Sequence, residues 1–95
     1  MDLPGNVTGL ELELDMETGA VNVSWSPPVY DGGEILGYKV FRRISTGVYV
    51  LLLTVEDELW ALDDDPKLVL GEEYYYTVRA FNTMGDGPEG LELAI

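Results

Sequence analysis

The stretch from Leu68 to Asn82 constrains the fold of this chain more than any other segment. Beyond the turn residue Gly71, side chains alternate between two environments, and many of them are aromatic or β-branched. One set comprises Tyr74, Tyr76, Val78 and Ala80, and the other comprises Tyr75, Thr77, Arg79 and Phe81. Alternation with a period of two predicts a β-strand that has one face in the core and one face outside it.

The first residue of this strand adds a second constraint. Tyr74 lies a few residues after Leu68 and Gly71, so its hydroxyl can fold back onto the preceding loop. A tyrosine in that position is typical of the tyrosine corner of Greek-key β-sandwiches.

Six further segments have the composition of strands, and turn residues separate them at intervals typical of a sandwich or a small barrel. They are residues 7–14, 20–26, 35–43, 48–55, 59–62 and 91–95, which makes seven expected strands and no helix. The faces of the fourth segment stay open, because Leu51, Leu52 and Leu53 do not alternate. We expect residues 1–6 to form a loose lead-in and residues 7–95 to form one domain.

The charge balance and two missing residue types exclude several classes of function. The chain has 18 acidic and 5 basic residues and a net charge of −13, whereas nucleic acids and anionic membranes are bound through basic surfaces. No apolar run approaches the roughly 20 residues that span a bilayer, and the first residues do not resemble a signal peptide. The chain has no histidine and no cysteine, so it lacks histidine-based triads and thiol nucleophiles. We therefore expect no enzyme activity, no cofactor, no nucleic-acid partner and no membrane insertion.

The order and spacing of the segments resemble a fibronectin type III domain over residues 4–95. The pieces that carry the resemblance are Trp25-Ser26-Pro27-Pro28, Asp31-Gly32-Gly33, residues 35–40, then Leu68, Gly71 and Tyr74, and finally residues 78–82 and 85–88. Two features depart from the family. Leu70 stands where the family often has proline, and the integrin-binding tripeptide Arg-Gly-Asp is absent. Integrin binding by that route is therefore not supported.

The resemblance implies an all-β, seven-stranded, immunoglobulin-like antiparallel β-sandwich with Greek-key topology and without disulfides. The first, second and fifth strands would form one sheet, and the other four strands would form the second. Trp25 would be the central aromatic residue of the core. The remaining core residues implied are Tyr38, Val40, Leu68, Tyr74, Tyr76 and Val78.

Two acidic runs raise the question of a calcium site. Residues 63–65 and 56–58 are rich in carboxylates, which calcium prefers as ligands, but the alternating acids and closing glutamate of a calcium loop are missing. We favour a solvated loop in which Asp65 sets the turn at Pro66, with calcium as the alternative. Sequons at Asn6 and Asn22 fit glycosylation, although such short patterns often arise by chance.

One predicted face combines basic and aromatic side chains, a composition enriched in interfaces. Its residues are Lys39, Phe41, Arg43, Tyr75, Thr77, Arg79 and Phe81, opposite an acidic face with Glu11, Glu13 and Asp15. This mixed face could bind a partner or a second copy of the chain. We favour the alternative that its residues pair across the strands, with Phe41 against Phe81 or Tyr75 and Arg79 against Glu92. A second candidate surface lies in the loops 26–34 and 82–88, where Tyr30 and Met84 are the sizeable apolar side chains.

These features predict a non-catalytic module, a spacer or protein-interaction domain of a larger extracellular or surface protein. Its partners would be proteins or neighbouring domains of the same chain, and the domain itself would be monomeric. The alternatives are an accessory domain of a polysaccharide-acting enzyme and an engineered stand-alone scaffold without a natural ligand.

Overall fold

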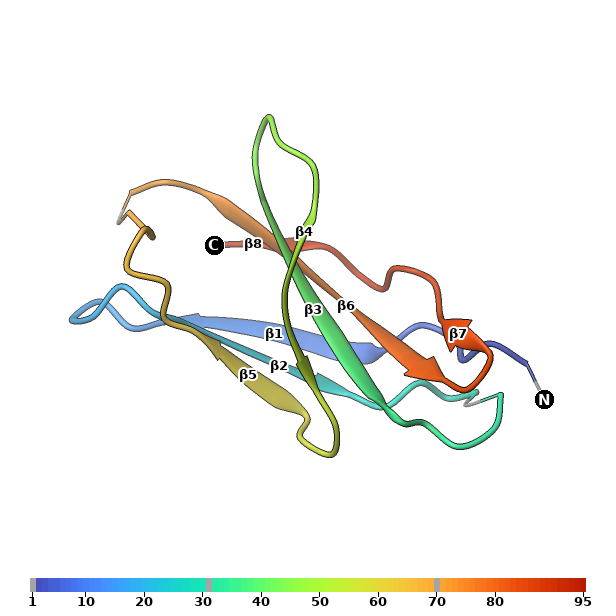
Figure 1. Cartoon of the computed structure of the whole chain (residues 1–95). Coiled ribbons are helices and arrows are strands. Elements are labelled where there is room, and N and C mark those ends of the chain that lie inside the picture. The colour runs from blue at the N-terminus through green and yellow to red at the C-terminus, as the bar shows by residue number, and fades with distance from the viewer. Residues whose placement is uncertain (1, 31, 70) are drawn as a thin grey trace.

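Two antiparallel sheets pack face to face in the computed structural model, which describes residues 2–30, 32–69 and 71–95 (Figure 1). The strands are β1 (Thr8–Leu14), β2 (Val21–Ser26), β3 (Gly37–Ile44), β4 (Val50–Val55), β5 (Trp60–Asp63), β6 (Tyr74–Asn82), β7 (Gly85–Asp86) and β8 (Leu93–Ala94). The first sheet has the order β1-β2-β5. The second has the order β4-β3-β6-β7, and β8 also pairs with β6. This confirms the all-β sandwich and the division of strands between its sheets. The predictions that concern Asp31 and Leu70 lie outside the described residues.

The strand count differs from the prediction by one, because the short strand β7 forms in a segment that was predicted to be a loop. Both β7 and β8 pair with β6, and Pro88 and Gly90 lie in the segment between them. Proline cannot donate to a ladder and glycine weakens a strand, so the pairing breaks there. Leu93 and Ile95 pack against the core as the alternation predicts, but Leu91 is 60% exposed.

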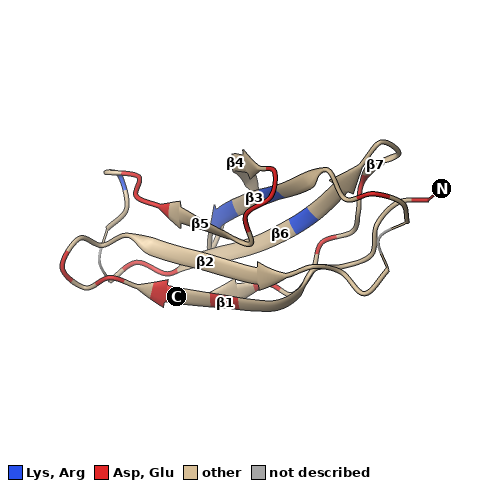
Figure 2. Ribbon diagram, turned by 90° about the horizontal axis from the view of Figure 1, so that it is seen from below, with Lys and Arg blue, Asp and Glu red and all other residues tan. Residues whose placement is uncertain are grey.

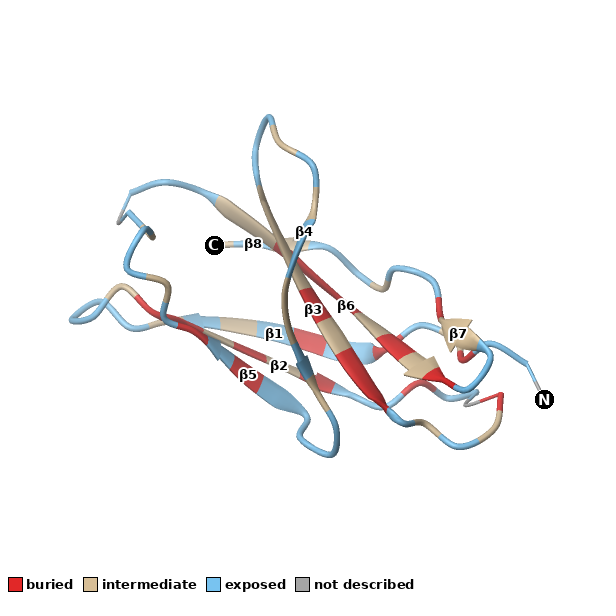
Figure 3. Ribbon diagram, in the orientation of Figure 1, coloured by how far each residue is buried: buried red, intermediate tan, exposed pale blue. Residues whose placement is uncertain are grey.

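The core lies where β2 faces β3 and β6, as the buried segments in Figure 3 show. Trp25 is 4% exposed, and its ring centroid lies 5.5 Å from that of Tyr38. The inward residues of β6 are fully enclosed, and Tyr76 and Val78 are both 0% exposed. Val40 is buried beside them. The predicted two-faced pattern of β6 therefore places Tyr76 and Val78 in the core around Trp25.

The tyrosine corner forms as predicted. The Tyr74 hydroxyl accepts a hydrogen bond from the Val69 backbone N–H at 2.9 Å, and Gly71 in the same loop has a φ of 94°. Tyr74 itself is half-buried and packs against the core. Leu68 differs from the prediction: it is half-buried and lies outside the core cluster, because the loop runs along the end of the sandwich rather than into it.

An irregularity in β4 explains why its leucines do not alternate. Val40 of β3 pairs with Leu53, but the next residue, Phe41, pairs with Leu51. Leu52 is therefore the extra residue of a β-bulge, which shifts the phase of the side chains along one strand. As a result, Leu52 and Leu53 both pack against the core, whereas Leu51 is 47% exposed.

Residues 2–6 do not form the loose lead-in that was expected from the sequence. The Asp2 N–H donates to the Gly32 carbonyl at 2.7 Å, and the Gly5 N–H donates to the Tyr30 carbonyl at 2.8 Å. Pro4 is fully buried, and the Asn82 amide donates to the Asp2 carbonyl at 2.7 Å. Backbone hydrogen bonds and a buried proline thus hold this segment against the loops at one end of the sandwich.

Candidate functional site: the two outer faces of the sandwich

The strands β3 and β6 carry the predicted mixed face on their outer side. We call this the paired face, and it comprises Lys39, Phe41, Arg43, Tyr75, Thr77, Arg79 and Phe81. The register places Lys39 opposite Arg79 and Arg43 opposite Tyr75. Thr77 points outward in this pattern yet is 1% exposed, and its hydroxyl donates to the Leu91 carbonyl at 3.4 Å. The segment that leads to β8 therefore covers part of this face.

Each cation of the paired face has an acidic partner within the domain. Lys39 lies 2.8 Å from Asp86, and Arg79 lies 3.0 Å from Glu89. Arg43 lies 3.0 Å from Glu92 and donates to both of its carboxylate oxygens. A bidentate guanidinium–carboxylate pair is among the stronger surface contacts.

The same cations lie over aromatic rings of this face. Lys39 is 5.3 Å from the centroid of Phe81, and Arg79 is 5.8 Å from that of Phe41. Arg43 is 4.1 Å from the centroid of Tyr75, within the range of cation–π attraction. The basic and aromatic groups thus satisfy one another, which agrees with the favoured alternative of pairing across the strands.

The individual pairs differ from those predicted. Arg79 binds Glu89 rather than Glu92, because the register of β8 brings Glu92 within reach of Arg43. Phe41 lies under Arg79, and no ring–ring pair on this face is recorded among the described residues. Hydrogen bonds from Arg43 and then from Tyr49 hold the pKa of Glu92 below its usual value.

A buried ion pair joins the two sheets, and sequence reasoning missed it. Arg42 Nη1 lies 2.7 Å from Asp63 Oδ2, which also accepts a hydrogen bond from the Tyr76 hydroxyl at 2.6 Å. Asp63 is 5% exposed. Although burial lowers the pKa of Arg42, its hydrogen bonds to Asp63 and Asp65 raise it above the usual value. Burial, and then the bond to Asp63, strongly raise the pKa of Tyr76.

The phase of the strands was the signal for this pair. Arg42 has the same phase as Tyr38 and Val40, and Asp63 has the same phase as Ala61. The alternation therefore predicts that Arg42 and Asp63 point inward.

Two of the three acidic residues in the run 63–65 therefore already have partners within the domain. Asp63 and Asp65 both bind Arg42, and Asp65 Oδ1 also accepts the Lys67 N–H at 2.9 Å. This last bond and the Arg42 bond hold the pKa of Asp65 below its usual value. The hydrogen bond from the Lys67 N–H to Asp65 also sets the turn at Pro66, as the sequence suggested. Within residues 2–30, 32–69 and 71–95, no group of three or more potential ligands could hold a metal ion.

The outer side of the other sheet has a different character. We call it the open face, and it comprises Glu11, Glu13, Asn22, Ser24, Trp60 and Leu62. The register aligns these residues in two rows across β1, β2 and β5. One row is Glu11–Ser24–Trp60 and the other is Glu13–Asn22–Leu62. Asp15, the third acidic residue predicted for this side, accepts hydrogen bonds from the Glu17 and Thr18 N–H groups in the adjoining turn.

The side chains of the open face have no partner among residues 2–30, 32–69 and 71–95. Trp60 is 54% exposed and Leu62 is 45% exposed. No side-chain hydrogen bond or ion pair of Glu11, Glu13, Asn22 or Ser24 is recorded in the described part of the chain. Lys and Arg are absent from the sequences of β1, β2 and β5, and Figure 2 shows the basic segments on β3 and β6, behind this sheet.

Sequence reasoning also missed Trp60. The signal was the alternation in β5, where Ala61 and Asp63 are buried and the residues between them, Trp60 and Leu62, point to solvent. Large apolar side chains that lie next to each other on the solvent side of a strand form an exposed patch, and such patches can mark interaction sites.

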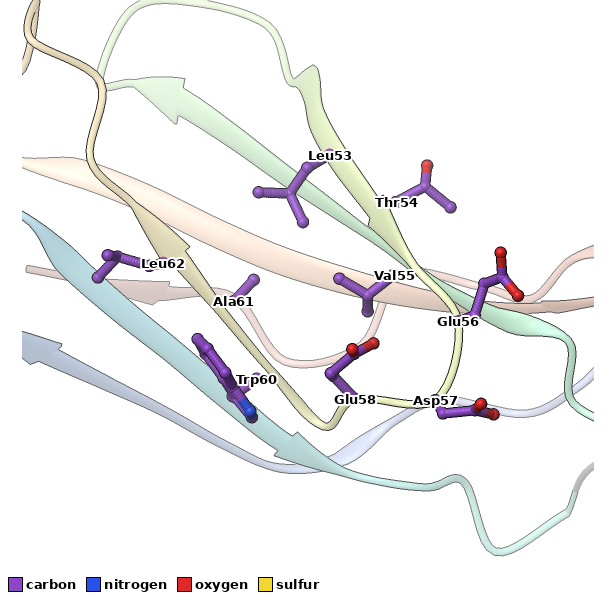
Figure 4. Close-up of a pocket in the computed structure, with 9 residues that line it drawn as sticks. All are labelled: Leu53, Thr54, Val55, Glu56, Asp57, Glu58, Trp60, Ala61 and Leu62. Carbon is purple, nitrogen blue, oxygen red and sulfur yellow. The ribbon is translucent and has the colours of Figure 1, made fainter.

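A hollow of about 600 Å³ lies beside the open face, between the edge strands β4 and β5 (Figure 4). Leu53 and Val55 of β4 point toward Ala61 across it, whereas Trp60 and Leu62 point away from β4. The acidic turn 56–58 closes one end. The hollow and the open face therefore share β5 as their common border.

The two loop residues predicted to contact a partner lie at one end of the sandwich. Tyr30 is 57% exposed and Met84 is 56% exposed. Their loops are anchored near residues 2–5, because Tyr30 accepts the Gly5 N–H and the Asn82 side chain caps the Met84 N–H at 2.9 Å. Their role in binding stays a prediction.

No helix in the described residues has the length and hydropathy that a membrane span requires.

Three comparisons place the domain among known proteins. Residues 5–95 match the family model of the fibronectin type III domain. A Fn3-like protein from Clostridium thermocellum superposes with a TM-score of 0.78 at 25% identity, over 96% of this chain and 90% of that one. The structure of titin kinase and its flanking domains superposes with a TM-score of 0.83 at 23% identity, over 97% of this chain and 16% of that one, which shows the fold alone.

A longer relative is similar in sequence over much of the domain. An amylopullulanase of Thermoanaerobacter thermohydrosulfuricus is 35% identical over 69 residues, which is 72% of this chain but 4% of that protein. The family match covers nearly the whole sandwich, including the Trp25 core and the tyrosine corner. The chain therefore belongs to the fibronectin type III domain family.

Proposed function

We propose that this domain is a non-catalytic spacer that holds neighbouring parts of a longer extracellular or surface protein apart. The observation that carries the proposal is the position of the chain ends. Asp2 is bound to Gly32 and Asn82 at one end of the sandwich. Ile95 exchanges backbone hydrogen bonds with Tyr74 toward the other end (Figure 1).

The shape of the domain supports the same role. Its principal extents are 43 × 25 × 19 Å, and the segment that begins at Asp2 and the segment that ends at Ile95 lie toward opposite ends of the sandwich. The chain has no histidine or cysteine, and its buried carboxylate, Asp63, is already engaged by Arg42 and Tyr76. Neighbouring domains of the same chain are its proposed first partners.

A distance measurement between the two ends tests the spacer role. Because the chain lacks cysteine, Asp2→Cys and a cysteine added after Ile95 would carry spin labels at those positions alone. We expect double electron–electron resonance to give one narrow distribution between the 25 Å and 43 Å extents, unchanged when a folded domain is fused at either end. Ends closer than 25 Å, or a broad distribution, would contradict a rigid spacer.

A second proposed role is that of an accessory domain in a polysaccharide-acting enzyme. The 35% identity to part of an amylopullulanase supports it, and so does the exposed Trp60 on a face whose polar groups have no partner in the described part of the chain. The sequence of the parent chain tests this role. A polysaccharide-acting domain beside this one is expected, and a parent made of fibronectin type III domains alone would contradict it.

A further inference from the structure

The open face combines an exposed indole with polar groups that no described residue binds. Trp60 stands at the end of the row Glu11–Ser24–Trp60, and Leu62 extends the apolar surface in the next row. Neighbouring strands lie about 4.8 Å apart, so each row spans about 10 Å, and the two rows lie about 7 Å apart along the strands. This area is wide enough for more than one sugar ring.

The polar groups determine which chemistry fits this face. Asn22 and Ser24 lie in the middle strand, and each can both donate and accept a hydrogen bond. Glu11 and Glu13 add acceptors beyond them. A sugar hydroxyl also donates and accepts, so a polyhydroxylated ligand can use all four groups together. A purely cationic ligand would leave the amide and hydroxyl donors beside Trp60 without acceptors, which costs binding energy.

The charge of the face restricts the ligand further. None of β1, β2 and β5 contains Lys or Arg, and the net charge of the chain is −13. Sulfated, phosphorylated or uronic acid polymers would therefore meet repulsion and find no cation. A neutral sugar presents C–H groups to the electron-rich face of an indole ring, which suits Trp60.

From these observations we propose that the open face binds a neutral polysaccharide, with a sugar ring stacked on Trp60 and hydroxyls bound by Asn22, Ser24 and the two glutamates. The inference rests on the proposed accessory role, and it adds the site and the ligand class. The hollow beside β5 gives the bound chain room to continue past Leu62.

Affinity electrophoresis tests the proposal. The domain is run in native gels that contain amylopectin, pullulan, hydroxyethyl cellulose or xylan, with polygalacturonate as the acidic polymer. Isothermal titration calorimetry with oligolysine covers the cationic alternative. We expect retardation by at least one neutral polymer, and no binding of polygalacturonate or oligolysine.

Matched variants locate the site. Trp60→Ala should weaken the retardation about tenfold or more, which is what losing a central aromatic contact costs, whereas Trp60→Phe should keep most of it. Phe41→Ala, on the paired face, should migrate like the parent. Urea unfolding followed by the fluorescence of the buried Trp25 confirms that each variant is folded.

Three results would overturn the proposal: no retardation by any of the four neutral polymers, equal retardation of folded Trp60→Ala and the parent, or binding of oligolysine alone. None of them bears on the spacer role, which the distance between the labelled ends tests independently. The accessory role is decided separately by the domains of the parent chain.

Discussion

The two outer faces of this sandwich differ in whether their polar groups are already bound. On the paired face, Lys39, Arg43 and Arg79 each contact an acid and an aromatic ring of the same domain. On the open face, Trp60 is exposed, and the neighbouring polar side chains make no hydrogen bond or ion pair with any other described residue. The comparison teaches that arginine and aromatic composition alone does not identify a binding surface. A surface whose groups satisfy one another has less to gain from a partner.

A substitution in the core between the two sheets should have the largest effect on stability. Trp25→Ala removes a 4% exposed indole from between the sheets, and such truncations cost about 3–5 kcal/mol. We expect a largely unfolded domain at room temperature by circular dichroism. Trp60→Ala is the matched control. Its free energy of unfolding should lie within about 0.5 kcal/mol of that of the parent, because the Trp60 side chain is mostly exposed. A cooperative melt of Trp25→Ala near that of the parent would be incompatible with the proposed core.

Breaking the buried ion pair that joins the sheets should cause the second-largest loss of stability. Asp63→Ala leaves Arg42 with only Asp65 and removes the acceptor of the Tyr76 hydroxyl. Breaking a buried pair in this way should cost about 3 kcal/mol of unfolding free energy in urea titrations. The exposed neighbour Asp64 provides the control, and Asp64→Ala should change stability little. Equal costs at the two positions would mean that the buried pair does not hold the sheets together.

A matched substitution on the two faces sharpens their contrast directly. Glu89→Gln removes the partner of Arg79 on the paired face and should cost about 0.5 kcal/mol, as exposed ion pairs do. Glu13→Gln on the open face should cost nothing or stabilise slightly, since it breaks no pair and lowers the excess negative charge. Urea midpoints at low ionic strength measure both. The contrast fails if Glu13→Gln proves the more destabilising change.

The smallest effect concerns pH. Hydrogen bonds from Arg43 and Tyr49 lower the pKa of Glu92 in the folded state. A lowered folded pKa gives stability that is present above the unfolded pKa, about 4.3, and is lost as the pH falls through the folded value. Glu92→Gln should therefore be less stable than the parent at pH 7, and the difference should shrink towards pH 3. A difference that stays constant between these pH values would contradict the pairing.

The strands were largely predictable because alternation reports which side chains share a face. It placed Tyr76 and Val78 in the core, and the spacing of Gly71 and Tyr74 predicted the tyrosine corner. Alternation does not show which residues face each other across strands, so the predicted pairing of Arg79 with Glu92 was wrong. It also could not show a bulge, and the phase shift at Leu52 became visible only when the register with β3 was known.

The open face was missed for a related reason. In sequence, Trp60 and Leu62 stand in a four-residue strand in which three residues are apolar but only two positions are buried. Their exposure depends on the outer side of β5, an edge strand, which no described segment covers. The Arg42–Asp63 pair likewise needed the stacking of two sheets, because its partners lie 21 residues apart on different layers.

The most direct test of the difference between the faces is a chemical-shift map. The ¹⁵N-labelled domain is titrated with maltoheptaose and then with cellohexaose, and indole and backbone amide signals are followed. We predict that at least one sugar shifts the Trp60 indole and amides of β1, β2 and β5, while the Trp25 indole and the amides of Lys39 and Arg79 stay in place. Shifts confined to β3 and β6, or no shifts with either sugar, would contradict the account.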